Sequence, residues 1–184
     1  MDRIKNTIIA LTLTLVLAAG AVFAAPETTR GGITNNQQLT EHIRKELVTL
    51  PYFGVFDNLA FKVEGETVTL YGQVVRPTTR SDAERRVEKI EGVERVINQI
   101  QVLPLSSFDD SIRVRAYRAI FNSGGLYRYA MGANPSIHIV VDHGNVTLEG
   151  VVSNKMDAQL AYMAASGVPG VFSVTNHLRV EHAD

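Results

Sequence analysis

The stretch Val68-Thr69-Leu70-Tyr71-Gly72 decides the fold, because it returns later in the chain as Val146-Thr147-Leu148-Glu149-Gly150. Residues 63–102 align with residues 141–180 without a gap at an offset of 78 residues, and 12 of the 40 pairs are identical. Identities at a fixed spacing indicate two copies of one supersecondary unit. We therefore predict a duplicated small domain, in which residues that differ between the copies point to function.

The first copy shows the periodicities of two helices and three strands. Apolar spacing from Leu39 to Leu50 predicts a helix that Pro51 ends. Alternating apolar residues over 59–63 and 68–74 predict a hairpin with one buried face. A second helix follows from Pro77, and a third strand covers 93–102. The second copy repeats this order over 108–121, 137–141, 146–152, 154–166 and 171–180.

These elements predict an α+β protein with two tandem α-β-β-α-β domains. A helical crossover returns each third strand parallel to the second, so two helices pack on one face of a three-stranded mixed sheet. The polar segment 25–36 lacks apolar periodicity and is predicted to be a flexible lead. The predicted domain boundaries are 37–103 and 108–184, joined by a short linker over 104–107.

The first 24 residues have the pattern of a secretory signal peptide. Arg3 and Lys5 precede an apolar run from Ile8 to Ala19, and a small-residue cleavage site ends near Ala24. A transmembrane anchor would need roughly 20 apolar residues, and this shorter run contains two threonines. The chain has no cysteine, which excludes a lipoprotein anchor and disulfides. We expect a periplasmic or secreted protein.

Composition argues against several classes of function. Cleavage would remove Arg3, Lys5 and Asp2, leaving 16 basic and 18 acidic residues and a net charge of −2, so no global field recruits nucleic acid. No nucleotide-binding loop or nucleophile motif is present, and we predict neither enzymatic activity nor a cofactor. The histidines show no metal-ligand spacing, so no metal site is predicted: His42, His138, His143, His177 and His182.

Three pairs of repeated polar or small residues are predicted to be structural. Gly72 and Gly150 lie inside strands, where glycine indicates a bulge or room for a packed helix. Asn98 and Asn176 share the parity of the buried valines, so each amide is predicted to bond to loop backbone. The third pair, Gly92 and Gly170, is predicted to end the second helix of each copy in a left-handed conformation.

Two repeated motifs give a family resemblance. The sequence resembles the BON domain over residues 37–182, through V-x-L-x-G on the second strand and G-V-x-x-V-x-N-x-[IL]-x-V on the third. The matching residues are Val68, Leu70, Gly72, Gly92, Val93, Val96, Asn98, Ile100 and Val102, then Val146, Leu148, Gly150, Gly170, Val171, Val174, Asn176, Leu178 and Val180. The resemblance implies a non-enzymatic, exported bacterial envelope protein that associates with phospholipid membranes and supports envelope integrity under stress.

The second copy departs from the first between its first helix and first strand. Ile43 pairs with Ile112 at an offset of 69, whereas Val63 pairs with Val141 at 78, which leaves nine extra residues in the second copy. No acid occurs between Asp110 and Asp142. Basic and aromatic residues gather there, as on surfaces that meet anionic lipid headgroups. The candidate lipid-binding residues are Arg113, Arg115, Tyr117, Arg118, Tyr127, Arg128 and Tyr129.

An ordinary solvated helix face remains the alternative for these arginines, which would then pair with acids such as Asp109, Asp110 or Glu149.

The second helix of the second copy is also distinctive, since residues 158–165 are almost entirely apolar. A helix that is apolar on several sides is usually buried on several sides. Leu160, Tyr162 and Met163 are therefore candidate contacts with the other domain or with a partner.

Two functions from different classes stay open at this point. The first is an envelope-maintenance protein that binds peripherally to an anionic phospholipid membrane through the acid-free segment. The second is a periplasmic, chaperone-like stress protein that binds unfolded client or envelope proteins through exposed apolar surface. The salt dependence of lipid binding separates them, because contacts between exposed charges are screened within about 10 Å at 0.1 M salt.

Overall fold

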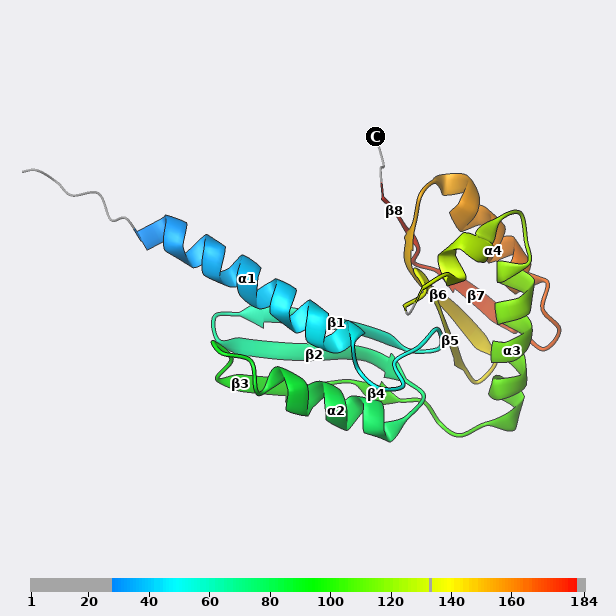
Figure 1. Cartoon of the computed structure of the whole chain (residues 1–184). Coiled ribbons are helices and arrows are strands. Elements are labelled where there is room, and N and C mark those ends of the chain that lie inside the picture. The colour runs from blue at the N-terminus through cyan, green and yellow to red at the C-terminus, as the bar shows by residue number, and fades with distance from the viewer. Residues whose placement is uncertain (1–27, 133, 182–184) are drawn as a thin grey trace, which may run out of the picture.

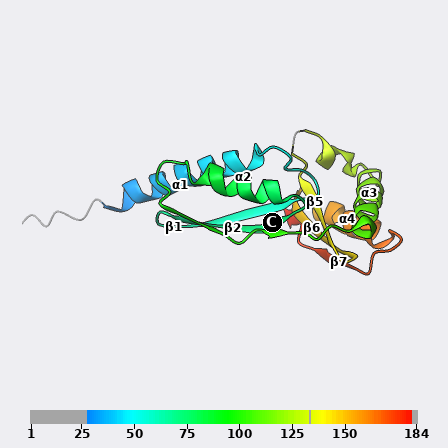
Figure 2. The same cartoon turned by 90° about the horizontal axis from the view of Figure 1, so that it is seen from below.

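The computed structural model describes residues 28–132 and 134–181, so the predicted signal peptide over 1–24 lies outside the described residues. The first domain contains α1 (Thr28–Val48), β1 (Asn58–Glu64), β2 (Thr67–Val74), α2 (Pro77–Val87), β3 (Arg95–Asn98) and β4 (Gln101–Val102). β2 pairs antiparallel with β1 and parallel with both β3 and β4. Helices α1 and α2 cover one face of this sheet (Figure 2).

The second domain repeats this arrangement. Its elements are α3 (Ser107–Phe121), the 3-10 helix η1 (Leu126–Ala130), β5 (Ile137–Asp142), β6 (Asn145–Val152), α4 (Lys155–Ser166), β7 (Ser173–Asn176) and β8 (Arg179–Val180). β6 is the central strand, antiparallel to β5 and parallel to β7 and β8. The predicted α+β class and the duplicated α-β-β-α-β order are confirmed, and η1 occupies the connection that is longer in this copy. None of the described helices is long and apolar enough to cross a bilayer.

The central strands organise the two cores. In β2, Val68, Leu70 and Val74 are fully buried, and Val146, Leu148 and Val152 are their counterparts in β6. These residues share one face of the strand because side chains alternate along it. The helices contribute the opposing layer, with Ile43 and Ala83 in the first domain. Burying apolar surface on that face stabilises each domain by roughly 25 cal/mol for each Å² removed from water.

Asn98 and Asn176 break the third strand of each sheet at the same place. Asn98 Oδ1 accepts a hydrogen bond from the Ile100 N–H at 3.1 Å, and its Nδ2 donates to the Arg80 carbonyl at 3.2 Å. Asn176 bonds to Leu178 and to the Ala158 carbonyl in the same way. Ile100 and Leu178 lie in the breaks between β3 and β4 and between β7 and β8, so the predicted bond to loop backbone is confirmed, and a bond to a helix carbonyl accompanies it.

Gly72 and Gly150 are required by a close approach of backbone within the hairpins. Gly72 has φ +114°, and a Cβ there would stand 2.0 Å from the carbonyl oxygen of Asn58. Gly150 has φ +122°, and a Cβ there would stand 2.0 Å from the Ser136 carbonyl oxygen. The neighbouring strand's carbonyl, rather than a packed helix, fills the space beside each glycine.

Two local expectations are wrong. The lead predicted to be flexible over 25–36 is helical from Thr28, and the first turns of α1 project beyond the sheet (Figure 1). A helix that is already nucleated gains one hydrogen bond per added residue, so it extends without an apolar stripe. Gly92 does not end α2, which stops at Val87. Like Gly170, it has positive φ in a later turn that leads into the third strand.

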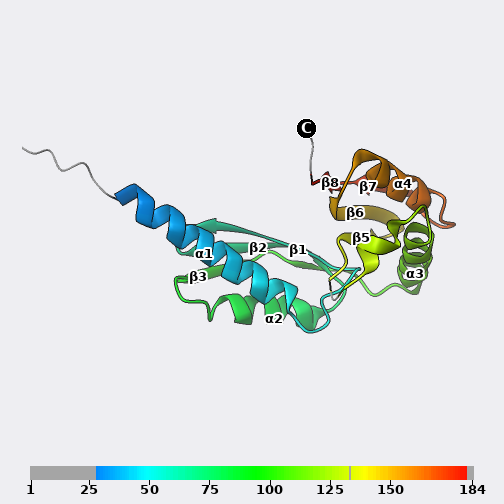
Figure 3. The ribbon, with the colours of Figure 1, turned by 45° about the horizontal axis from the view of Figure 1, so that its top comes forward.

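The segment 49–57 of the first domain forms the joint with the second domain. The Val55 carbonyl accepts a hydrogen bond from the Ile139 N–H at 2.7 Å, at the outer edge of β5. Val55 and Phe56 pack against the second core. Covering an edge strand satisfies its free backbone groups and blocks its pairing with other chains. Figure 3 shows this loop reaching the second domain.

Two titratable groups lie inside this joint. His138 Nδ1 lies 3.2 Å from the Gly54 carbonyl and therefore carries the hydrogen, and the imidazole packs on Phe53 at 5.4 Å between ring centroids. Asp57 accepts the N–H groups of Gly54 at 3.0 Å and Val75 at 2.7 Å. Burial lowers the pKa of His138, although Asp57 and Glu149 act against that shift, and burial raises the pKa of Asp57.

Replacing Gly150 with alanine should destabilise the protein by about 2–5 kcal/mol, because the new Cβ meets a backbone carbonyl at a φ that L residues avoid. Urea unfolding measures the difference. Gly167→Ala is the matched control, since its Cβ would make only ordinary contacts at 3.7 Å or more and its φ is −79°. Equal stability of the two variants would contradict the close approach.

Stability should fall as the pH drops from about 7 toward 5, because His138 is protonated less readily in the fold than in the unfolded chain, where its pKa is near 6.5. Protonation of Asp57 has the opposite effect on stability nearer to pH 4. Because its pKa is raised in the fold, the folded protein binds this proton more readily than the unfolded chain does. Urea midpoints at pH 7.5 and 5.5 measure the loss. His138→Gln should lose less stability over this interval than wild type; an identical loss in both proteins argues against a buried neutral imidazole.

Candidate functional site

Helix α3 carries most of the predicted lipid-binding residues, and its start is tied to the hairpin of β5 and β6. The Ser106 hydroxyl caps the helix by accepting the Asp109 N–H at 3.1 Å. The buried Asp109 carboxylate in turn accepts the N–H groups of His143 at 3.0 Å and Gly144 at 2.8 Å. The carboxylate belongs to a residue of α3 and the two donors are backbone groups of the turn between β5 and β6, so these bonds fix the position of α3 on its sheet.

Arg113 was expected on the solvent side of α3, and this expectation is wrong. The side chain is only 3% exposed, and its Nη2 donates to the Val141 carbonyl at 2.7 Å. Its Nη1 donates to Asp110 Oδ1 at 2.5 Å. A long aliphatic stem lets arginine lie along apolar surface while the guanidinium reaches a polar partner. Arg113 therefore joins α3 to β5 and engages the acid at position 110.

Arg128 and Tyr129 also differ from the expected free surface. Tyr129 is buried, and its hydroxyl donates to Asp157 Oδ2 at 2.6 Å and accepts the Ser153 N–H at 2.9 Å. Arg128 forms a salt bridge with Asp157 and lies over the Tyr129 ring at 4.8 Å. These contacts fasten η1 to the start of α4. The sequence indicated no such pairing, because the partners are distant in the chain.

Five of the seven candidates retain exposed surface, and one of these is the salt-bridged Arg128. Arg118 and Tyr127 are exposed, and Arg115 is half-buried with its Nη2 donating to Ser111 Oγ at 3.1 Å. Within the part of the chain that the structure describes, neither Arg115 nor Arg118 forms a salt bridge. Tyr117 is partly exposed, and its ring contacts Phe121 at 4.8 Å and Phe56 of the first domain at 6.3 Å between centroids. Tyr117 therefore belongs to the joint as well.

The predicted contact residues on α4 do not form the joint between domains. Leu160 packs inside its own domain, against Gly124. Tyr162 and Met163 are exposed, and α4 lies away from the first domain (Figures 1 and 3). The first domain reaches the second through the segment 49–57 instead. A role for Tyr162 and Met163 in binding a partner stays a prediction.

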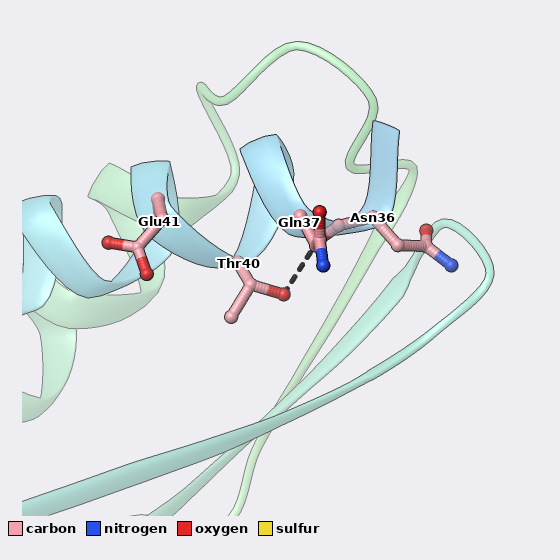
Figure 4. Close-up of a pocket in the computed structure, with 4 residues that line it drawn as sticks. All are labelled: Asn36, Gln37, Thr40 and Glu41. Atoms are coloured by element: carbon pink, nitrogen blue, oxygen red, sulfur yellow. Dashed lines mark hydrogen bonds between the residues drawn. The ribbon is translucent and has the colours of Figure 1, made fainter. Parts of the chain in front are cut away.

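Other surface features show no chemical site. A hollow beside α1 is lined by Asn36, Gln37, Thr40 and Glu41, where the Thr40 hydroxyl donates to the Asn36 carbonyl at 2.7 Å (Figure 4). The Glu41 carboxylate and the Asn36 amide point away from each other there. Over residues 28–132 and 134–181, no three histidine or carboxylate side chains are grouped so that they could hold a metal ion.

The fold defines a class of tandem α-β-β-α-β domains, and the described residues include no grouped metal ligands. The BON domain family model matches twice, at residues 35–104 and 109–182, and the chain belongs to the BON domain family. BON domains are non-enzymatic binding domains associated with phospholipid binding.

Comparison with curated proteins gives no match. Among solved structures, the chain is similar to the C-terminal domain of CdsD, a structural protein of the type III secretion system of Chlamydia trachomatis. One CdsD structure shares 12% identity over 77% of this chain and 96% of that chain, with a TM-score of 0.32. A second shares 12% identity over 77% of this chain and 91% of that chain, with a TM-score of 0.29. TM-scores this low do not establish a shared arrangement.

Proposed function

We propose that this protein is a non-enzymatic, exported envelope protein that binds peripherally to anionic phospholipid surfaces and so supports envelope integrity or stress tolerance. Membership of the BON domain family supports the lipid-binding part of this proposal. The signal-like pattern of residues 1–24 supports a periplasmic or secreted location after cleavage near Ala24.

The outer face of α3 is the observation that carries the proposal. Val114 and Arg118 are exposed there, and Arg115 flanks them. Both acids of the helix are engaged within the domain, because Asp109 accepts backbone N–H groups and Asp110 pairs with Arg113. Arg118 is exposed, and the half-buried Arg115 forms no salt bridge among the described residues. Each basic residue near an anionic membrane contributes about 1 kcal/mol.

The first domain lacks this chemistry at the equivalent positions. At the helix offset of 69 residues, Arg115 corresponds to Glu46 and Arg118 corresponds to Thr49. Glu46 forms a salt bridge with Arg86 of α2 at 3.0 Å. The same helix position therefore holds a paired acid in one copy and an arginine without a salt bridge in the other, which supports lipid contact by the second domain.

Wild-type protein should co-sediment with phosphatidylglycerol vesicles, and less so as salt rises, because exposed charges are screened. Reversing both charges, Arg115→Glu with Arg118→Glu, should weaken binding at least tenfold, as an order-of-magnitude estimate for two lost attractions. The double variant Arg44→Glu with Lys45→Glu makes the same charge change on the exposed side of α1 and should retain most binding.

The proposal fails if wild type does not bind these vesicles, or if both double variants bind as wild type does. An equal loss in both would show a response to net charge rather than a site on α3.

The alternative function, chaperone-like binding of unfolded clients, is favoured by the exposed, uncharged residues Met156, Tyr162 and Met163 on α4. Methionine adapts to varied partners. That function predicts suppression of client aggregation without lipid and with little dependence on salt.

A further inference from the structure

Two phenylalanine rings are exposed at the end of the second domain where α3 begins. Phe172, in the turn between α4 and β7, is 74% exposed, and Phe108, in the first turn of α3, is 46% exposed. Their ring centroids lie 6.0 Å apart. We call this pair the aromatic tip. Leu105, in the linker that enters α3, is 95% exposed and adds apolar surface next to it along the chain.

The aromatic tip is held by backbone rather than buried in a core. The Phe172 N–H donates to the Gly144 carbonyl at 2.9 Å, which fixes the turn after α4 against the hairpin of β5 and β6. The Phe172 ring covers Gly144 so closely that a Cβ there would stand 2.6 Å from it. A ring that is placed this firmly and yet left mostly in solvent is prepared for contact outside the domain.

A cation accompanies the rings. Arg115 Nη2 and Phe108 Cζ both lie 3.4 Å from the position that a Cβ of Gly170 would occupy. Of the nearby acids, Asp110 forms a salt bridge with Arg113, and Asp142 lies within hydrogen-bond distance of His143 Nδ1 at 2.6 Å. The tip thus combines apolar rings with a positive charge, which suits the boundary between anionic headgroups and acyl chains.

The first domain carries opposite chemistry at the equivalent end. At the offset of 78 residues, Glu94 stands where Phe172 stands, Glu66 where Gly144 stands, and Glu91 where Pro169 stands. All three glutamates are exposed. Repulsion from an anionic surface would keep that end in solution. The two copies share a backbone but present one acidic end and one aromatic, basic end.

We propose that the aromatic tip penetrates the headgroup region of an anionic bilayer, with Phe108 and Phe172 at the acyl boundary and Arg115 beside the phosphates. The second domain then docks end-on, with the start of α3 toward the membrane. This inference rests on the proposed function and goes beyond it by specifying penetration, the residues that penetrate and the orientation of the domain.

The chain contains no tryptophan, so Phe172→Trp introduces a single tryptophan at the tip, whose emission can be excited separately from that of the six tyrosines. With phosphatidylglycerol vesicles we expect a blue shift of its emission, and quenching when the acyl chains are brominated near the headgroup. Glu94→Trp places the same fluorophore at the equivalent end of the first domain and should show neither change. Quenching at position 94, or none at position 172 with the protein bound to the vesicles, overturns the proposal.

A second comparison measures affinity. Phe172→Glu installs the residue of the first copy and should weaken vesicle binding at least tenfold, an order-of-magnitude value for one aromatic side chain removed from an apolar environment. Met131→Glu adds the same charge at another exposed apolar position, just after η1, and should bind nearly as wild type does.

Three results contradict end-on docking in different ways. If Phe172→Glu binds as wild type does while reversal of Arg115 and Arg118 abolishes binding, the tip proposal fails and the proposed function stands. If wild type does not bind vesicles at all, both fail. If Phe172→Trp shows a blue shift without vesicles that depends on protein concentration, the tip binds a second copy of the chain instead.

Discussion

Each domain depends on a central strand that is hydrogen-bonded on both sides and buried on one face. β2 and β6 each lie between an antiparallel neighbour and a parallel one, so their backbone groups are paired along both edges. Their alternating valine and leucine side chains then fix which face the helices cover. A sheet with one covered face makes a small core, and small cores gain from packing together. The segment 49–57 provides that packing by closing the edge of β5.

Duplication separates this scaffold from the surfaces that differ. Both copies retain the glycine that meets a carbonyl and the asparagine that bonds to a helix carbonyl. Both features make contacts within their own domain. The charge of the first helix and the residues at the turns do differ, because Glu46 and Glu94 in one copy correspond to Arg115 and Phe172 in the other. Arg115 lies between the outer face of α3 and the aromatic tip, so the proposed attraction and the proposed penetration would involve one side of the second domain.

Periodicity predicted the strands, the helices and their order, since alternation and helical spacing are local properties of the chain. It did not predict that Arg113 is buried, because the side chain reaches the Val141 carbonyl of a strand that is distant in sequence. The contact of Tyr129 with Asp157 and the joint at Val55 have the same long-range character. Periodicity does not distinguish Phe172, although aligning the copies places it opposite Glu94. The alignment of the two copies therefore distinguishes Phe172 by sequence, and the structure shows that its ring is exposed.

Hydrogen exchange of the backbone amides tests the central claim, that the second domain alone meets the membrane and does so through one end. The full chain is compared with phosphatidylglycerol vesicles and with neutral phosphatidylcholine vesicles. With the anionic vesicles, exchange should slow over residues 105–118 and 170–173, while the turns around Glu66 and Glu94 exchange as in solution. Protection centred on the first domain, or protection spread evenly over both domains of the bound protein, would contradict this account.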